Sequence, residues 1–127
     1  MNLDTRMAAI VLGVIFVLVG LIGFVPNPIA SPAGIFAVNT NHNIVHIVSG
    51  VVLLAGAYTG LGPSMALKII GVIYALVAIA GFAMAGDMMF GVIAMNDADR
   101  WFHVFLAILL LASGYGLPAG SARAAAA

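Results

Sequence analysis

Two histidines in matching contexts are the side chains of this sequence best suited to chemistry. His46 follows Asn39 with six residues between them, and His103 follows Asn96 with the same spacing. Each histidine stands near the start of a long apolar run, which predicts that both imidazoles lie near one boundary of the apolar region and face its interior. A neutral imidazole can bind a metal ion or haem iron, or it can serve only as a hydrogen-bonding group. The duplicated pattern therefore marks a candidate site and leaves its chemistry open.

The composition indicates an integral membrane protein. Charged residues make up 6% of the chain and hydrophobic residues 65%, whereas soluble domains carry about 25% charged residues. Four apolar runs cover about residues 7–25, 44–61, 65–85 and 101–117. Each is close to the roughly 20 residues that a helix needs to cross a bilayer. We therefore predict an all-α membrane protein, a four-transmembrane-helix bundle with both termini on one side.

The first and third runs are copies of each other. Gly13-Val14-Ile15 recurs as Gly71-Val72-Ile73, and Gly23-Phe24 recurs as Gly81-Phe82. A cleaved signal peptide, the alternative for the first run, has no reason to recur in mid-chain. The short link at 62–64 permits only an antiparallel return.

The duplication predicts two tandem helical hairpins of the same orientation within a single membrane domain, 1–127. Repeat 1 covers about 7–61 and repeat 2 about 65–117, and 118–127 is predicted to be a flexible tail. Small residues at helical spacing are expected to line the packed helix faces, because helices in lipid associate through close van der Waals contact. The predicted packing residues are Gly13, Gly20, Gly23, Gly50, Gly71, Ala78, Gly81 and Ala107.

Polar residues before the second and fourth apolar runs are typical of helix starts. We predict Asn41, Asn43, Asp97 and Asp99 as helix caps, since their side-chain oxygens can accept hydrogen bonds from unpaired backbone N–H groups. Asn39 and Asn96 are predicted to lie in the outer loops and to fold back onto backbone or imidazole groups.

The few cations indicate the orientation. Arg6, Lys68 and Arg123 fall on the side of the termini, and only Arg100 falls on the opposite side, in the company of three aspartates. The positive-inside rule then places both termini in the cytoplasm and loops 26–43 and 86–100 outside. The lipid bilayer is the expected partner. A nucleic-acid partner is excluded, because four scattered basic residues form no basic patch.

The residues around the two histidines also carry a family resemblance. The segments Val38–Gly50 and Met95–His103, together with the glycine-rich first and third helices, resemble the bacterial four-helix membrane family catalogued as domain of unknown function 4383. This resemblance spans essentially the whole chain. It implies a small protein of the bacterial plasma membrane with Asn39, His46, Asn96 and His103 as its signature positions, and it implies no established activity. A looser similarity is to DoxX-like membrane proteins, some of which are partners of oxidoreductases.

Three functional hypotheses follow from the sequence. The leading one is a non-catalytic scaffold or accessory subunit that packs with itself or with a larger membrane complex. In this hypothesis the histidines only hold the outer loops in place through hydrogen bonds. The first alternative is a haem- or metal-binding protein in which His46 and His103 bind the cofactor, with Asp97, Asp99 or His42 as further ligands of a metal. The second is a small transporter or channel-like oligomer. The sequence names no catalytic residue, no defined metal-ligand set and no cofactor, because two histidines underspecify any ion.

Overall fold

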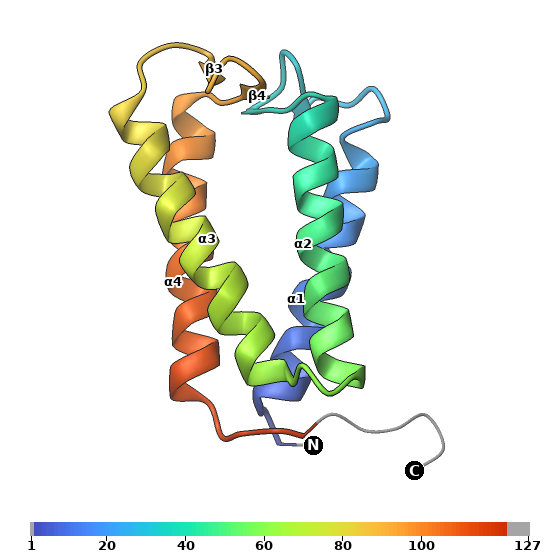
Figure 1. Cartoon of the computed structure of the whole chain (residues 1–127). Helices are drawn as coiled ribbons and strands as arrows, with labels where there is room; N and C mark the ends of the chain where they lie inside the picture. The colour runs from blue at the N-terminus through green and yellow to red at the C-terminus, as the bar shows by residue number, and fades with distance from the viewer. Residues whose placement is uncertain (1, 122–127) are drawn as a thin grey trace.

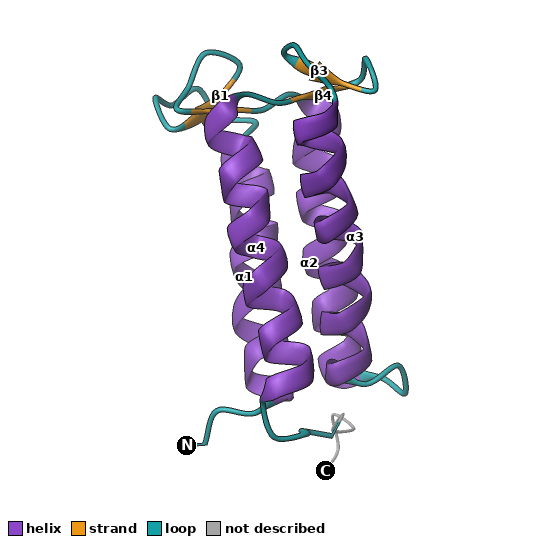
Figure 2. Cartoon of the chain, turned by 90° about the vertical axis from the view of Figure 1, so that its left-hand side faces the viewer, coloured by secondary structure: helices purple, strands orange, loops and turns teal. Residues whose placement is uncertain are grey.

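Four helices make up most of residues 2–121, which are the residues that the computed structural model describes (Figure 1). They are α1 (Thr5–Ile22), α2 (Thr40–Tyr58), α3 (Pro63–Ala83) and α4 (Asp97–Gly116). The α1–α2 and α3–α4 loops lie at one end, and the α2–α3 link lies at the other end with the chain termini (Figures 1 and 2). The prediction of four helices is confirmed.

Two small strand pairs fold the long loops over one end of the bundle (Figure 2). In the first loop, β1 (Ala30–Ser31) pairs in parallel with β2 (Phe36–Ala37). In the second, β3 (Met88–Met89) pairs antiparallel with β4 (Ile93–Ala94). Strands of two residues leave no periodic signal in a sequence, so the all-helical prediction did not include them.

The helices pack as two hairpins that meet along one side. α1 contacts chiefly α2, α3 contacts chiefly α4, and α2 and α3 join the hairpins, while α1 and α4 have the weakest contact of the adjacent pairs. Leu53, Leu67 and Leu110 are fully buried between them. The α1–α4 side is therefore the loosest part of the bundle.

The small residues predicted for helix packing are not all equally necessary. A Cβ atom added at Gly50 would lie 2.6 Å from the carbonyl oxygen of Gly13, and one added at Gly71 would lie 2.7 Å from the Leu111 side chain. One added at Gly81, however, would meet its nearest neighbour, the Arg100 side chain, at 3.5 Å, an ordinary contact distance. Close approach at 3.0 Å or less would occur at Gly13, Gly20, Gly23, Gly50 and Gly71, and Ala78 and Ala107 are buried.

The helix caps differ from the prediction. Helices α2 and α4 begin at Thr40 and Asp97, about one turn before the apolar runs, so the capping residues are Asn39 and Asn96. The Asn39 side chain accepts from the backbone N–H of His42, and the Asn96 side chain accepts from that of Asp99. The first turn of each helix contains polar residues. The apolar run therefore begins after the helix does, and it does not mark the first helical residue.

The residues predicted as caps have other contacts. Asn41 donates to the Val92 carbonyl at 2.9 Å, and Asn43 is buried with no hydrogen-bond partner for its Oδ1 atom. Asp97 forms an ion pair with Arg100 at 2.8 Å. Only Asp99 takes part in a cap, because its carboxylate accepts from the Asn96 N–H and completes a capping box.

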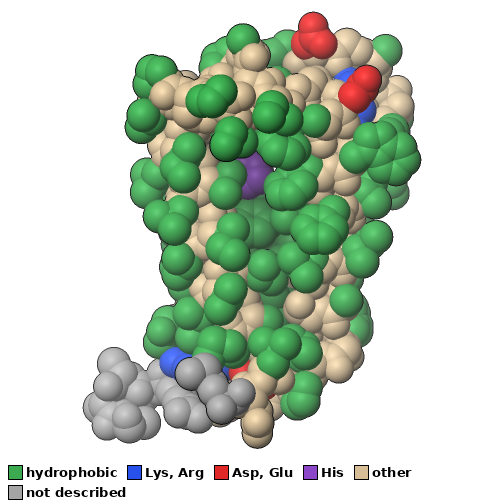
Figure 3. All heavy atoms as spheres, turned by 180° about the vertical axis from the view of Figure 1, so that it is seen from behind, with side chains coloured by type: hydrophobic (Ala, Val, Ile, Leu, Met, Phe, Trp, Pro, Cys, Tyr) green, Lys and Arg blue, Asp and Glu red, His purple; other side chains and the backbone are tan. Residues whose placement is uncertain are grey.

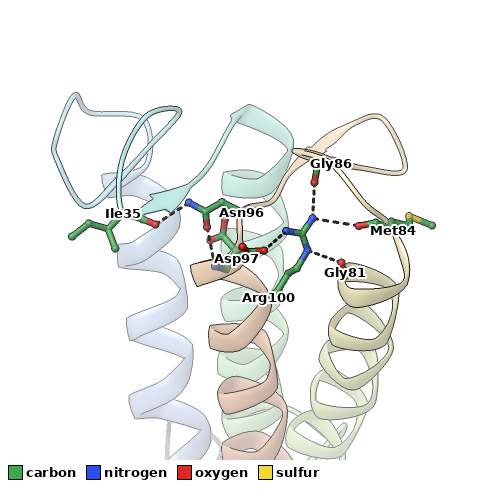
Figure 4. Close-up of polar contacts among 8 residues, drawn as sticks. Ile35, Gly81, Met84, Gly86, Asn96, Asp97 and Arg100 are labelled. Carbon is green, nitrogen blue, oxygen red and sulfur yellow. Dashed lines mark hydrogen bonds and ion pairs between the residues drawn. The ribbon is translucent and has the colours of Figure 1, made fainter.

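The capping asparagines also connect the two repeats. Asn39 Nδ2 donates to the Val92 carbonyl at 3.0 Å, and Asn96 Nδ2 donates to the Ile35 carbonyl at 2.9 Å. Arg100 donates to the carbonyls of Gly81, Met84 and Gly86, and so ties α4 to the end of α3 (Figure 4). The outer loops are thereby fixed over the helix ends.

The cap of α2 can be tested against a matched neighbour. Asn39 and Asn41 both donate to the Val92 carbonyl, but only Asn39 caps the helix. We expect Asn39→Ala to lower the free energy of unfolding by about 1 kcal/mol more than Asn41→Ala, the usual contribution of an N-cap. Thermal and denaturant unfolding of the two variants in detergent measures this. Equal losses would assign the stabilisation to the shared loop contact.

The beginning of the predicted flexible tail is held in place. The Thr5 N–H donates to the Pro118 carbonyl at 3.0 Å, and the Gly120 N–H donates to the Thr5 hydroxyl at 2.8 Å. Residues 122–127, with Arg123, lie outside the described residues. Pro118 and Gly120 thus provide hydrogen-bond partners for the N-terminus of α1, and the flexibility of the tail stays a prediction.

Two helices have the length and hydropathy needed to cross a membrane. These are Thr5–Ile22, with a mean hydropathy of 2.4, and Pro63–Ala83, with a mean hydropathy of 2.2. The polar first turns of α2 and α4 lower their mean hydropathy. The two apolar helices suggest that the protein associates with a membrane.

Candidate metal centre

Three histidines converge at the loop end of the bundle. His42 and His46 come from α2 and His103 from α4. Their potential ligand nitrogens all lie within 4.8 Å of one another, and the side chains are 2%, 5% and 4% exposed. The two histidines of the repeated motif thus meet, with ring centroids 6.0 Å apart, and a third joins them.

His42 lies outside the repeated motif, and the sequence suggested it only as one possible further ligand of a metal. It has no counterpart in the second repeat, where Asp99 occupies the equivalent position. Its signal in the sequence is its spacing from His46, because residues four apart lie on the same face of a helix. The two rings stack with their centroids 4.9 Å apart.

Backbone carbonyls orient two of the rings. His42 Nδ1 lies 2.7 Å from the Ala94 carbonyl oxygen, and His103 Nδ1 lies 2.6 Å from that of Asp99. A carbonyl oxygen can only accept, so Nδ1 carries the hydrogen and Nε2 keeps a free lone pair. This arrangement is typical of histidine ligands, whose second nitrogen usually donates to a carbonyl or carboxylate.

His46 differs from the other two histidines in its contacts. Within the described residues its ring has no hydrogen-bond partner, although only 5% of the residue is exposed. Among the described residues, the fully buried side-chain N or O atom without a partner is Asn43 Oδ1, so the His46 ring nitrogens keep some access to the adjoining cavity. An ion bound at the centre of the three rings would supply a partner for His46.

Aromatic side chains form the inner wall of the cluster. The Tyr74 ring stacks on His103 at 5.6 Å, and the Phe16 ring lies 5.6 Å from His46. Because Ser49 Oγ donates to the Val45 carbonyl at 2.7 Å, the Tyr74 hydroxyl donates to Ser49 at 3.1 Å. The packed Phe16 and Tyr74 rings limit the space in which the His46 and His103 rings can rotate. Phe16, Ser49 and Tyr74 were not predicted from the sequence to belong to the site.

A cavity of about 310 Å³ lies beside the cluster. Its lining consists of the three histidines and residues from α1, the first loop and α4: Val19, Ile22, Asn27, Ile29, Ala30, Phe36, Val38, Asp99 and Phe102. The Asp99 carboxylate is engaged in the α4 cap. Asp97, the other carboxylate weighed as a ligand, is paired with Arg100 and is not among the lining residues.

Comparison with family models identifies the chain. The model described as Domain of unknown function (DUF4383) matches residues 6–116. The chain belongs to this family. The match includes all three histidines and both capping asparagines of the DUF4383 protein. Comparison with curated proteins and with solved structures gives no match, and the looser similarity to DoxX-like proteins is not shown.

The geometry of the DUF4383 site suits a single transition-metal ion. Imidazole is a preferred ligand of Zn²⁺, Cu²⁺, Ni²⁺ and Fe²⁺. Separations of up to 4.8 Å exceed the roughly 3.4 Å between the nitrogen ligands of a tetrahedral zinc ion. Binding therefore requires the rings to move together by about 1 Å. Three imidazoles leave the fourth coordination position open.

The close approach of the three histidine rings disfavours haem, the other cofactor considered for His46 and His103. The macrocycle would have to occupy the space between those two rings. His42 lies in that region, with its ring centroid 5.5 Å from His103 and 4.9 Å from His46. Three close imidazoles match the ligand set of one ion better than the axial pair of haem.

Proposed function

We propose that this DUF4383 protein is a four-span protein of the bacterial plasma membrane that binds one transition-metal ion through His42, His46 and His103. The observation that supports the proposal is the convergence, within 4.8 Å, of ring nitrogens from three buried histidines. Two of the rings already direct Nδ1 at carbonyl oxygens. The metal site would lie at the loop end of the bundle, and its fourth coordination position would be open to another ligand.

The outward faces of the helices support four membrane spans. Apolar side chains cover the face drawn in Figure 3, and charged side chains gather near its two ends. On α2, Val48 and Val51 are 55% and 54% exposed, and on α4, Phe105 and Ile108 are 55% and 63% exposed. Helices of 19 and 20 residues reach about 30 Å, the thickness of the hydrocarbon core.

The distribution of cations supports an orientation with both termini in the cytoplasm. Arg6 and Lys68 lie at the terminal end, where each stacks on a tyrosine ring, at 4.8 Å on Tyr58 and at 4.5 Å on Tyr115. Arg100 lies at the loop end and is neutralised by Asp97. By the positive-inside rule, loops 26–43 and 86–100 face outward, and the metal site lies near that side of the membrane.

The scaffold hypothesis receives less support from the geometry. It rested on small-residue faces available to a partner helix. Those residues are used within the chain, where Gly50 packs on Gly13 and Gly71 packs on Leu111. The transporter hypothesis lacks a polar route, because Leu53, Leu67 and Leu110 fill the core below the histidines.

Metal loading tests the proposal directly. Protein purified in maltoside micelles, stripped with a chelator and dialysed against Co²⁺, is expected to hold about one ion per chain and to develop the visible absorption of a four-coordinate Co²⁺ site. Excess Zn²⁺ should abolish this absorption by displacement. Elemental analysis counts the bound ions. A protein that stays colourless and metal-free after exposure to Co²⁺, Zn²⁺ and Cu²⁺ would refute the proposal.

A further inference from the structure

An apolar fissure between α1 and α4 leads from the outer surface of the bundle to the three histidines. It comprises the cavity of about 310 Å³ and a smaller one of about 30 Å³, which share Val19, His46 and Phe102 in their linings. These helices have the weakest contact among neighbouring pairs. Figure 3 shows the result as a hollow with a histidine side chain visible inside it. The site therefore opens sideways, toward the lipid in a membrane.

The walls of the fissure are apolar up to the histidines. Val19 and Ile22 line one side and Phe102 the other, and Leu106 lines the smaller cavity. Asn27 is a polar lining residue, but its side chain is already hydrogen-bonded within the chain. Its amide nitrogen donates to three backbone carbonyls, and its oxygen accepts from two backbone N–H groups. The polar groups that could bind a ligand therefore lie at the end of the fissure where the histidines are.

Charge determines which head group would fit there. A divalent ion on three neutral imidazoles has two positive charges, and Asp99, which lines the same cavity, provides one negative charge. One positive charge remains at a site whose three histidines are only 2–5% exposed. A buried charge without a partner is strongly unfavourable, so the open coordination position favours a monoanionic oxygen ligand.

We propose that the fissure binds a single-chain amphiphile with a monoanionic head, of the long-chain carboxylate class, that enters from the membrane. This inference rests on the proposed metal site. The carboxylate completes the coordination of the ion, and the chain leaves between α1 and α4. A volume of about 310 Å³ is at the lower limit of ligand pockets, roughly 300–1,000 Å³. It therefore accommodates the head and the first part of one chain, with the remainder in lipid.

A titration of the Co²⁺-loaded protein in uncharged maltoside micelles separates the contributions of head and chain. Palmitate is expected to change the visible Co²⁺ spectrum at a concentration at least tenfold below that of acetate, which has the same head without the chain. Hexadecanol, which has the chain without the charge, is expected to leave the spectrum unchanged. Equal effective concentrations of palmitate and acetate would overturn the inference.

Two tryptophan variants on α1 form a matched pair. Ile22 and Leu21 are both 50% exposed, but only Ile22 is among the residues that line the fissure. We expect Ile22→Trp to raise the half-saturating palmitate concentration at least tenfold without changing Co²⁺ affinity. Leu21→Trp should behave as the unmodified protein in both measurements. An equal response of the two variants to palmitate would contradict entry between α1 and α4.

The remaining outcomes separate this inference from the function on which it rests. Failure to bind Co²⁺ refutes the metal site and the inference together. Normal Co²⁺ binding with a spectrum insensitive to palmitate refutes only the inference. A response to the two-chain lipid phosphatidic acid at lower concentration than to palmitate would identify a lipid head group as the ligand and overturn the assignment of a single-chain carboxylate.

Discussion

Replacement of His103 by alanine is expected to lower the affinity for Co²⁺ or Zn²⁺ by about 100-fold or more. A ring nitrogen of His103 is one of the three that meet within 4.8 Å, and the ring is held by the Asp99 carbonyl. Loss of a residue that only orients a ligand already costs 10–100-fold in metal affinity. Competition with a chromophoric chelator measures the affinity, and His42→Ala and His46→Ala should give losses of the same order.

Tyr74→Phe is the control for damage to the fold. Tyr74 stacks on His103 and is fully buried, but its hydroxyl bonds to Ser49 and offers no ligand to the cluster. This variant should keep the metal affinity within a few-fold while losing some stability, because the Tyr74–Ser49 hydrogen bond is lost although Ser49 still donates to the Val45 carbonyl. If the histidines only hold the outer loops in place, the alanine variants will lose stability and the unmodified protein will show no metal-dependent rise in Tm.

Gly50→Ala is expected to lower the free energy of unfolding by about 2–3 kcal/mol, the upper part of the range of roughly 1–3 kcal/mol that is typical of overpacking. Its added Cβ would lie 2.6 Å from the Gly13 oxygen and 2.8 Å from the Val17 backbone nitrogen. Because both atoms belong to the α1 backbone, the contact can be relieved only by separating the two helices. Thermal unfolding in detergent, followed by circular dichroism, gives the change in Tm.

Gly81→Ala provides the matched comparison in the other hairpin. It lies inside α3 and is buried, yet its added Cβ would first meet the flexible Arg100 side chain at 3.5 Å. Alanine is favoured over glycine within a helix by up to about 1 kcal/mol. We therefore expect Gly81→Ala to be neutral or stabilising. A loss of stability equal to that of Gly50→Ala would mean that the helix glycines contribute through something other than close backbone approach.

The sequence by itself was sufficient to predict the helices and the pairing of the repeated histidines. Runs of about 20 apolar residues and the nearly absent charge restrict the chain to long helices. The internal copy makes the two hairpins equivalent, so His46 and His103 were expected at the same end and facing inward. Their ring centroids are 6.0 Å apart. Helix periodicity and repetition are local properties, which is why they can be read from the residues alone.

Only the tertiary structure decided the features that depend on distance between segments. His42 joins the site because Ala94, from the other repeat, orients its ring. The caps at Asn39 and Asn96 are defined by the backbone geometry of the first helical turns. The fissure exists because α1 and α4 remain further apart than the glycine-packed pairs. Each depends on how closely two segments approach, and that separation is set by the packing of the whole bundle.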